Sequence, residues 1–281
     1  MLPTLTVAVI SRNEAPLLQA CLERTDGADE LLVLDMESSD NTREIAARFG
    51  AKVLRVPLVP IAEQIRQIGV DAAESDWLLW VDADERLPVG FLDSLSPHLG
   101  RADVEAYFLE FRDVTFGRPT QYMNRGASKV ALMRPRRTTY STDAAAHQRP
   151  QIAGRLESLV GQVDPIEHLA FRSVRQVLEK TLRYAESGGG TMLHGSGADP
   201  FLLPRMLWTA LVMRGAVLDG TEASVAATMS AYGEYLSRIK VWEAAGLAHE
   251  DISPITRRLL LVARVTADRS RRVRHTFKAS S

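Results

Sequence analysis

Cysteine and long apolar runs are almost absent from this sequence of 281 residues. Cys21 is its single cysteine, so no internal disulfide can form, and one thiol suits a reducing compartment. The longest apolar run, residues 206–218, contains Arg214 and falls short of the roughly 20 residues that a membrane-spanning helix needs. The first residues carry no basic segment typical of a secretory signal, so we expect a core strand there. These absences favour a globular protein of the cytoplasm.

Net charge is also nearly absent, but only as an average. The sequence has 34 basic and 35 acidic residues, and 25% charged with 46% hydrophobic residues is typical of a packed globular protein. Residues 255–281 contain eight basic residues and one acid, so this segment carries +7 and the rest of the chain −8. We expect it to contact an anionic membrane surface or to dock on the protein with a solvated basic side. Nucleic acid is not expected, because aromatic residues are not interleaved with the basic ones.

Strand and helix patterns alternate through the first hundred residues. Short apolar runs predict strands at 5–10, 30–35, 52–56 and 77–81. Helical spacing predicts helices at 15–23, from the cap Asp40 to Phe49, and at 61–73. Such alternation is typical of a mainly parallel, Rossmann-like α/β sheet with helices on both faces.

The pattern changes after Gly100. Strands expected at 106–112 and 129–134 have no helix between them, which predicts antiparallel members of the sheet. Residues 135–165 are expected to form loops. Helices are expected at 173–186, 201–218, 222–245 and 253–274. We therefore divide the chain into an α/β domain, residues 1–172, and a helical C-terminal region with the basic tail, residues 173–281.

Polar clusters follow three of the expected strands, at residues 11–14, 35–40 and 82–85. Ligands of open parallel sheets bind beyond the carboxyl ends of the strands, so these clusters predict a site. Asp82 and Asp84, directly after a buried strand, can both reach a hard cation such as Mg²⁺ or Mn²⁺, which keeps positions open for diphosphate oxygens.

Three segments carry a resemblance to a known family. The runs VAVISRNE (7–14), LVLDMESSDNT (32–42) and WLLWVDADE (77–85) resemble the nucleotide-sugar-binding half of family 2 glycosyltransferases, which have the GT-A fold. Looser likenesses, at 215–220, 231–232 and 240–243, are similar to the helical end of the WaaE-like, lipopolysaccharide-core β-1,4-glucosyltransferase branch. The resemblance covers most of residues 4–243.

The resemblance implies roles for individual residues. It places the metal between the donor diphosphate and Asp82, Asp84 and His168. Asp35 would bind the base, Ser11 and Asn13 would line the nucleoside pocket, and Arg66 would pair with the diphosphate. The implied donor contacts also include Glu14, which could alternatively complement the dipole of the helix that follows it, and Ala83.

The resemblance also implies an inverting reaction, which needs a single carboxylate base. Its position corresponds to Glu157, but Leu156 stands where the family has a histidine, so Glu110, Asp113 and Asp143 stay open as alternatives. The chain also has Arg12 and the pair Met36-Glu37 where the family carries other residues. We expect these changes to affect the pocket for the nucleobase or the sugar and to leave the phosphate chemistry in place.

We therefore expect a hexosyltransferase that moves a sugar from a nucleotide-diphosphate donor to a saccharide or lipid-linked saccharide in cell-envelope polysaccharide synthesis, on the inner membrane face if the tail binds lipid. A peptide or small natural product is the next acceptor class. A sugar nucleotidyltransferase is a second reading, weakened by the lack of glycine in residues 11–14. A non-catalytic GT-A binding protein is a third hypothesis, and the intact Asp82/Asp84 pair argues against it.

Overall fold

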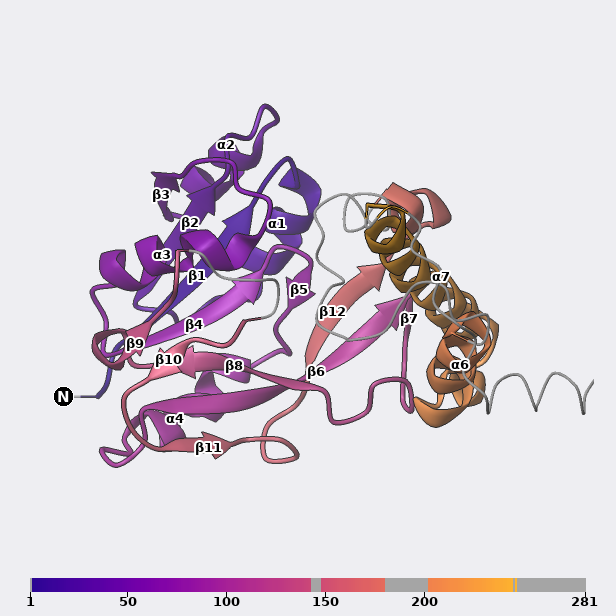
Figure 1. The fold of residues 1–281 in the computed structure, drawn as a ribbon. Helices are drawn as coiled ribbons and strands as arrows, with labels where there is room; N and C mark the ends of the chain where they lie inside the picture. The colour runs from indigo at the N-terminus through magenta and orange to yellow at the C-terminus, as the bar shows by residue number, and fades with distance from the viewer. Residues whose placement is uncertain (1, 143–147, 180–201, 245, 247–281) are drawn as a thin grey trace, which may run out of the picture.

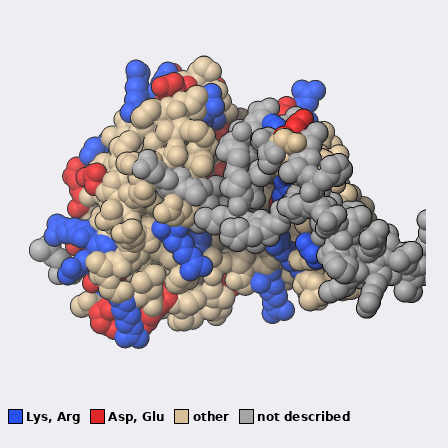
Figure 2. Space-filling model, in the orientation of Figure 1, with Lys and Arg blue, Asp and Glu red and all other residues tan. Residues whose placement is uncertain are grey.

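The computed structural model describes residues 2–142, 148–179, 202–244 and 246. It has an α/β part built on one ten-stranded sheet and a helical part that lies beside strands β7 and β12 (Figure 1). Among the described residues, no helix combines the length and apolar character needed to cross a bilayer. On the face drawn in Figure 2, acidic and basic side chains are interspersed over the α/β part.

The sheet has the strand order β3-β2-β1-β4-β8-β6-β12-β5, with β7 and β11 also paired to β6. Strands β1 to β4 are parallel to one another, and β8 is antiparallel to both β4 and β6. The bounds are β1 Leu5–Ser11, β2 Glu30–Asp35, β3 Lys52–Arg55, β4 Trp77–Asp82, β5 Glu85–Arg86, β6 Ala106–Thr115, β7 Arg118–Pro119, β8 Ser128–Met133, β11 Leu156–Ser158 and β12 Ile166–Phe171. The predicted α/β class and its antiparallel members are confirmed.

The interval expected to be loops, residues 135–165, contains short regular elements. A 3₁₀ turn, η2 (Pro135–Arg137), leads into a small hairpin of β9 (Thr138–Thr139) and β10 (Gln151–Ile152). The strand β11 then pairs with the start of β6. Two- and three-residue strands have too few residues to show an alternating pattern, so the sequence did not reveal them.

The helices of the α/β part follow the predicted order. Residues 61–73 begin as a 3₁₀ turn before the α-helix, and the helix after β5 was not predicted. The bounds are α1 Ala15–Leu22, α2 Thr42–Arg48, η1 Ala62–Ile65, α3 Arg66–Ala72 and α4 Phe91–Leu99. Asp40 supports two helix starts, because its carboxylate accepts hydrogen bonds from the backbone N–H of Thr42 and of Ala15.

The core explains why these elements form. Alternate residues of β1 point to opposite faces of the sheet, so Val7 and Val9 join one apolar cluster while Ala8 and Ile10 join another. The first cluster contains residues of α1, α2 and α4, and the second contains residues of η1 and α3. Trp77 and Trp80 are fully buried in these two clusters, and Cys21 is buried in the first.

The helical part is broken more often than predicted. Residues 174–179 are helical, and the expected helix 201–218 is a series of α6 (Leu202–Trp208), the π-helical turn η3 (Thr209–Met213) and the 3₁₀ turn η4 (Ala216–Asp219). Gly215 separates the last two with φ of 77°, a conformation that favours glycine. The long helix α7 spans Thr221–Ala244. The helix expected at 253–274 lies outside the described residues.

Close packing of α3 on β4 yields a prediction. A Cβ on Gly69 would lie 2.4 Å from the Trp80 ring, which is fully buried. We expect Gly69→Ala to lower the free energy of unfolding by about 1–3 kcal/mol, because the core must move to accept the methyl group. Gly100→Ala is the control, since Gly100 has φ of −72° and a Cβ added there would meet nothing within 4 Å. Urea unfolding of both variants measures the difference, and equal stabilities would contradict the packing argument.

Candidate functional site

The carboxyl ends of β1, β2 and β4 bring three of the predicted site residues to one edge of the sheet. Ser11 is in register with Asp35 on β2, and Ile10 is in register with Asp82 on β4. Parallel neighbours place corresponding ends side by side, about 4.8 Å apart. The predicted convergence of Ser11, Asp35 and Asp82 is therefore present in the structure.

Asp82 is held between two cations. Its Oδ1 accepts a hydrogen bond from Nη2 of Arg66 at 2.9 Å, and its Oδ2 accepts one from Nζ of Lys129 at 3.1 Å. The Arg66 guanidinium also lies 4.9 Å from the centre of the Trp80 ring. Burial alone would raise the pKa of Asp82, but Lys129 and Arg66 outweigh it and hold that pKa well below its usual range. Asp82 is therefore an anion with both oxygens engaged.

Glu85 and Lys129 belong to the same cluster. Glu85 lies in the predicted polar run 82–85 but had no predicted role of its own, and Lys129 was not predicted. Glu85 is buried, accepts the backbone N–H of Asp82 through Oε2 at 2.8 Å, and pairs with Nζ of Lys129 through Oε1 at 2.6 Å. Burial raises the pKa of Glu85, with Lys129 opposing the shift and the charge of Asp82 adding to it. The acid follows the Asp-x-Asp run directly and could have been suspected from it. A single lysine in the distant strand β8 gives no such signal.

Asp84 and His168 face each other across the β5–β12 pairing. His168 is in register with Glu85 on β5 and with Asp113 on β6. Its Nε2 lies 3.6 Å from Oδ2 of Asp84, and its Nδ1 lies 2.9 Å from Oδ1 of Asp113. Asn124 donates a hydrogen bond to the other oxygen of Asp113 at 2.8 Å.

The side chains of Asp84 and His168 could together hold one divalent cation. Two neighbouring ligand atoms of an octahedral ion, at about 2.1 Å and 90°, lie roughly 3.0 Å apart. Oδ2 of Asp84 and Nε2 of His168, at 3.6 Å, would have to move closer together to share such an ion. A carboxylate on Nδ1, here from Asp113, is the usual partner that orients a metal-binding histidine. Burial would lower the pKa of His168, but the hydrogen bond to Asp113 and the negative charge of Asp84 outweigh it and raise the pKa to about 10. A metal would therefore have to displace a proton.

The number of protein ligands is small. Within the described ranges, no group of three or more His, Cys, Asp or Glu is placed to share an ion. Asp84 and His168 suit an ion whose other positions are filled by diphosphate oxygens and water. Asp82, bound to Arg66 and Lys129, is less available than the sequence suggested.

The loops after β1 and β2 are tied together by the residues expected to contact the nucleoside. Asp35 is fully buried and accepts hydrogen bonds from the backbone N–H of Ser38 and from Arg43. The side-chain oxygen of Asn13 accepts the backbone N–H of Ser39 at 2.7 Å. The buried hydroxyl of Ser11 has no hydrogen-bond partner in the described part of the chain. Asp35 and Asn13 thus shape this edge, and Ser11 keeps an unused hydroxyl.

Two further predicted donor contacts lie beside this edge. Glu14 immediately precedes α1, and its carbonyl accepts hydrogen bonds from the first turn of that helix. Ala83 is buried between Asp82 and Asp84 and packs in the first core cluster. The helix-start interpretation of Glu14 therefore agrees with its position.

A family model decides the identity of the fold. The model described as glycosyl transferase family 2 matches residues 6–160, more than half of the chain. The chain belongs to this family. Its α/β sheet with flanking helices is the GT-A class predicted from the sequence. The matched range includes the three strand ends and Lys129, and it stops short of His168.

Individual relatives match only part of this chain. A TPR repeat-containing protein of Synechococcus elongatus is 37% identical over 103 residues, which is 36% of this chain and 26% of that protein. An uncharacterized glycosyltransferase of Rickettsia bellii is 34% identical over 88 residues, 31% of this chain and 30% of that protein. The chain thus spans less than a third of the length of these curated relatives.

Solved structures similar to this chain have low sequence identity. Staphylococcus aureus TarS (residues 1–349) has a TM-score of 0.47 and 13% identity, covering 86% of this chain and 82% of that chain. The mannosyltransferase PcManGT of Pyrobaculum calidifontis, in complex with GDP-Man and Mn²⁺, has a TM-score of 0.46 and 15% identity, covering 95% of this chain and 81% of that chain.

The structure does not bring Glu157 of this family 2 chain to the Asp84–His168 pair. Glu157 pairs with Tyr107 near the start of β6, whereas His168 pairs with Asp113 on the same strand. Six residues along a strand correspond to about 20 Å. Glu157 is instead bound by Arg101 and Arg155.

The alternatives for the base lie elsewhere. Asp113 contacts His168, and Glu110 lines a pocket beside the β6–β12 pair. Asp143 lies outside the described residues.

The carboxylate cluster yields a prediction about stability. Lys129→Met leaves Asp82 and Glu85 without their shared cation, so we expect the free energy of unfolding to fall by about 2 kcal/mol, less than for a fully buried pair because Lys129 is part-exposed. Lys52→Met is the control, since Lys52 pairs with the exposed Glu74 and should change little. Urea unfolding without added metal compares them, and an equal loss in both variants would refute the proposed role of Lys129.

Proposed function

We propose that this chain transfers a sugar from a nucleotide-diphosphate donor to an acceptor hydroxyl with the help of Mg²⁺ or Mn²⁺. The observation that carries the proposal is the Asp84–His168 pair at the end of β4, with Asp113 orienting the histidine. Family membership supports glycosyl transfer, and the pair supports its dependence on a metal. The bound cation would neutralise the charge that develops on the leaving diphosphate.

The residues around the pair have complementary roles in this proposal. Asp84 and His168 hold the cation, and Asp82 holds Arg66 and Lys129 at the same edge. In this proposal the donor diphosphate lies beside Arg66 and Lys129, and these two side chains pair with its oxygens. The unused Ser11 hydroxyl and the Asp35–Arg43 pair would bound the nucleoside end, with Asn13, Glu14 and Ala83 shaping the loops.

An inverting reaction needs a carboxylate near the acceptor hydroxyl. Among the described candidates, Glu110 is favoured, because it lines a pocket that is also lined by Asn124, the hydrogen-bond partner of Asp113. Asp113 is already bonded to His168, and Glu157 lies at the other end of β6.

The finer assignment rests on the sequence resemblance of the helical part. We propose hexosyl transfer to a saccharide or lipid-linked saccharide of the cell envelope, as in the lipopolysaccharide-core branch. The proposed boundary at residue 172 falls between the end of β12 and the helical residues 174–179. Contact of residues 255–281 with the inner membrane face stays a prediction, since these residues are outside the described ranges.

Asp84 provides the first test. Asp84→Asn removes a charged metal ligand, so we expect Mn²⁺-dependent release of nucleotide from UDP-, GDP- or dTDP-sugars to fall by at least about 100-fold. Asp71→Asn is the control, because Asp71 is an exposed acid on α3 whose carboxylate accepts a hydrogen bond from Gln67, away from the strand ends. Near-normal metal-dependent turnover by a folded Asp84→Asn protein would reject the proposal.

Asp113 provides a second test of the same centre. Asp113→Asn keeps the size of the side chain but removes the charge that orients His168, so we expect Mn²⁺ affinity to fall by about 10–100-fold. Electron paramagnetic resonance titration of free Mn²⁺ measures this without turnover. Unchanged affinity would contradict the role of Asp113 in orienting His168 for a metal.

A further inference from the structure

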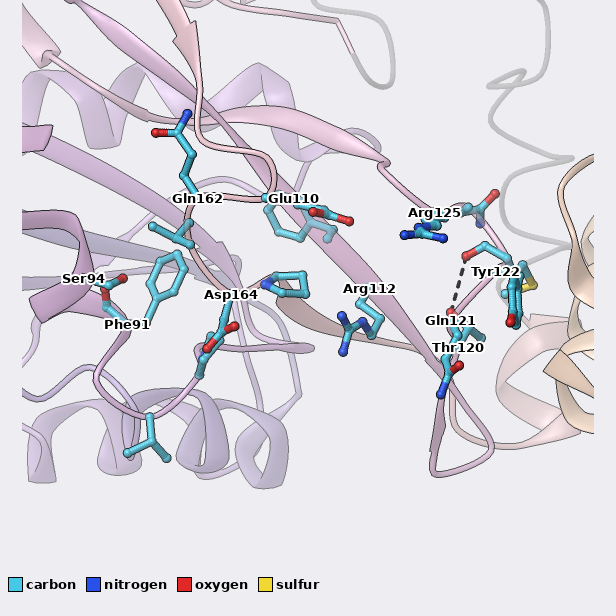
Figure 3. A pocket seen from close by; sticks show the side chains of 18 of the residues that line it. Phe91, Ser94, Glu110, Arg112, Thr120, Gln121, Tyr122, Arg125, Gln162 and Asp164 are labelled. Atoms are coloured by element: carbon cyan, nitrogen blue, oxygen red, sulfur yellow. Dashed lines mark hydrogen bonds between the residues drawn. The ribbon is translucent and has the colours of Figure 1, made fainter. Parts of the chain in front are cut away.

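A pocket of about 710 Å³ lies on the side of β6 where α4 begins (Figure 3). Its walls come from four segments of the sequence: residues 88–94 around the start of α4, residues 110–112 of β6, the loop 120–125 and the turn 161–165. Figure 3 shows Phe91 and Ser94 on one side of the pocket and Tyr122 and Arg125 on the other, with Arg112 between them. The predicted site residues other than Glu110 do not line it.

Direct contacts connect the pocket to the Asp84–His168 pair and to the charged cluster around Asp82. Asn124, in its wall, donates a hydrogen bond to Asp113, which in turn contacts His168. Phe111, also in its wall, has its ring centre 4.4 Å from the Lys129 ammonium, which binds Asp82. Two lining residues thus touch the charged cluster, and the pocket lies next to the proposed donor site.

The lining matches a neutral, polyhydroxylated ligand. Its carboxylates, such as that of Glu110, are equal in number to its guanidinium groups, such as that of Arg112. The lining also has amide groups, as in Gln121 and Gln162, and hydroxyl groups, as in Ser94. These groups offer both donors and acceptors of hydrogen bonds, as several sugar hydroxyls require. Tyr122 adds an aromatic ring that is 46% exposed, a surface on which the C–H face of a sugar ring can pack.

The wall that carries Tyr122 is held in place by the helical part. Asp219, at the end of η4, accepts hydrogen bonds from three successive backbone N–H groups, those of Gln121 at 2.7 Å, Tyr122 at 2.9 Å and Met123 at 2.6 Å. The Met123 side chain packs among alanines of η4 and α7. Asp219 is the last residue of η4, so the residue that ends this helical turn also fixes the loop.

We propose that this pocket binds the saccharide acceptor, with Tyr122 contacting a sugar ring and Asp219 acting as a positioning residue through the loop. The inference rests on the proposed function, since it places the acceptor beside a metal-bound donor. It also assigns a role to the helical part, which would shape the acceptor pocket without contacting the donor edge, the ends of β1, β2 and β4 where the donor is proposed to bind.

The test uses the full chain and four soluble saccharides: lactose, cellobiose, maltose and chitobiose. Nucleotide release with Mn²⁺ is measured with a UDP-, GDP- or dTDP-sugar, first alone and then with each saccharide. We expect at least one saccharide to raise the rate. Tyr122→Ala and Asp219→Asn should raise the KM for that saccharide about tenfold, the loss of one good contact, while the donor KM and the rate without saccharide stay unchanged.

Two control variants separate positioning from folding. Tyr122→Phe keeps the ring and should retain the wild-type KM. Glu222→Gln removes a carboxylate from the same helical part, but Glu222 pairs with the exposed Arg118, outside the pocket wall, so its KM should not change. Urea unfolding of all four variants shows whether each one is folded.

The outcomes separate the two proposals. If no donor is turned over, the proposed function fails, and saturation-transfer NMR of the same saccharides on wild type and Tyr122→Ala then tests the pocket alone. If donor is turned over but no saccharide raises the rate, the acceptor class is wrong. If Tyr122→Ala leaves the saccharide KM or the NMR signal unchanged, the location is wrong.

Discussion

The placement of two carboxylates against each other at the end of β4 is the constraint on which this site depends. Asp82 and Glu85 repel, and Glu85 is buried, so their coexistence requires cations within hydrogen-bond distance. The topology provides them from both sides. The antiparallel strand β8 lies between β4 and β6, so it begins at the edge where β4 ends and brings Lys129 there. Helix α3 begins with Arg66, which packs against Trp80 and reaches the other carboxylate oxygen of Asp82.

Asp82 is paired with Arg66 and Lys129, whereas Asp84, the second acid of the Asp-x-Asp run, contacts a different partner. Strand β12 lies between β5 and β6, so one residue on it can be in register with acids of both neighbours. His168 is that residue, with the side chain of Asp84 on one ring nitrogen and that of Asp113 on the other. Asp82 and Glu85 of the structural cluster and Asp84, the proposed metal ligand, thus lie in one four-residue segment, and their different partners separate the two roles.

Much of the donor edge could be predicted from the sequence, because parallel strands place their carboxyl ends together. That rule brought Ser11, Asp35 and Asp82 to one edge from three apolar runs alone. Lys129 could not be found this way, since an antiparallel strand brings its first residues to the edge, and the sequence does not reveal where such a strand inserts. Glu157 shows the same limit: its distance from the site depends on pairing with the start of β6, a contact about 50 residues away in sequence that no local pattern indicates.

The helical part also could not be understood from local pattern. Its contact with the α/β part relies on small side chains, the alanines around Met123, which bury little apolar area each. A polar link therefore carries much of the specificity of this contact. Three backbone N–H groups converge on the Asp219 carboxylate and fix both the position and the orientation of the loop 120–125. Asp219 is 97 positions away from Tyr122 in the sequence, so no local pattern indicates this contact. Because the other end of that loop reaches Asp113 through Asn124, a change in the helical part can alter the pocket wall while β1, β2 and β4 keep the donor edge unchanged. If the pocket binds the acceptor as proposed, changes in the helical part can alter acceptor choice without changing the ends of β1, β2 and β4.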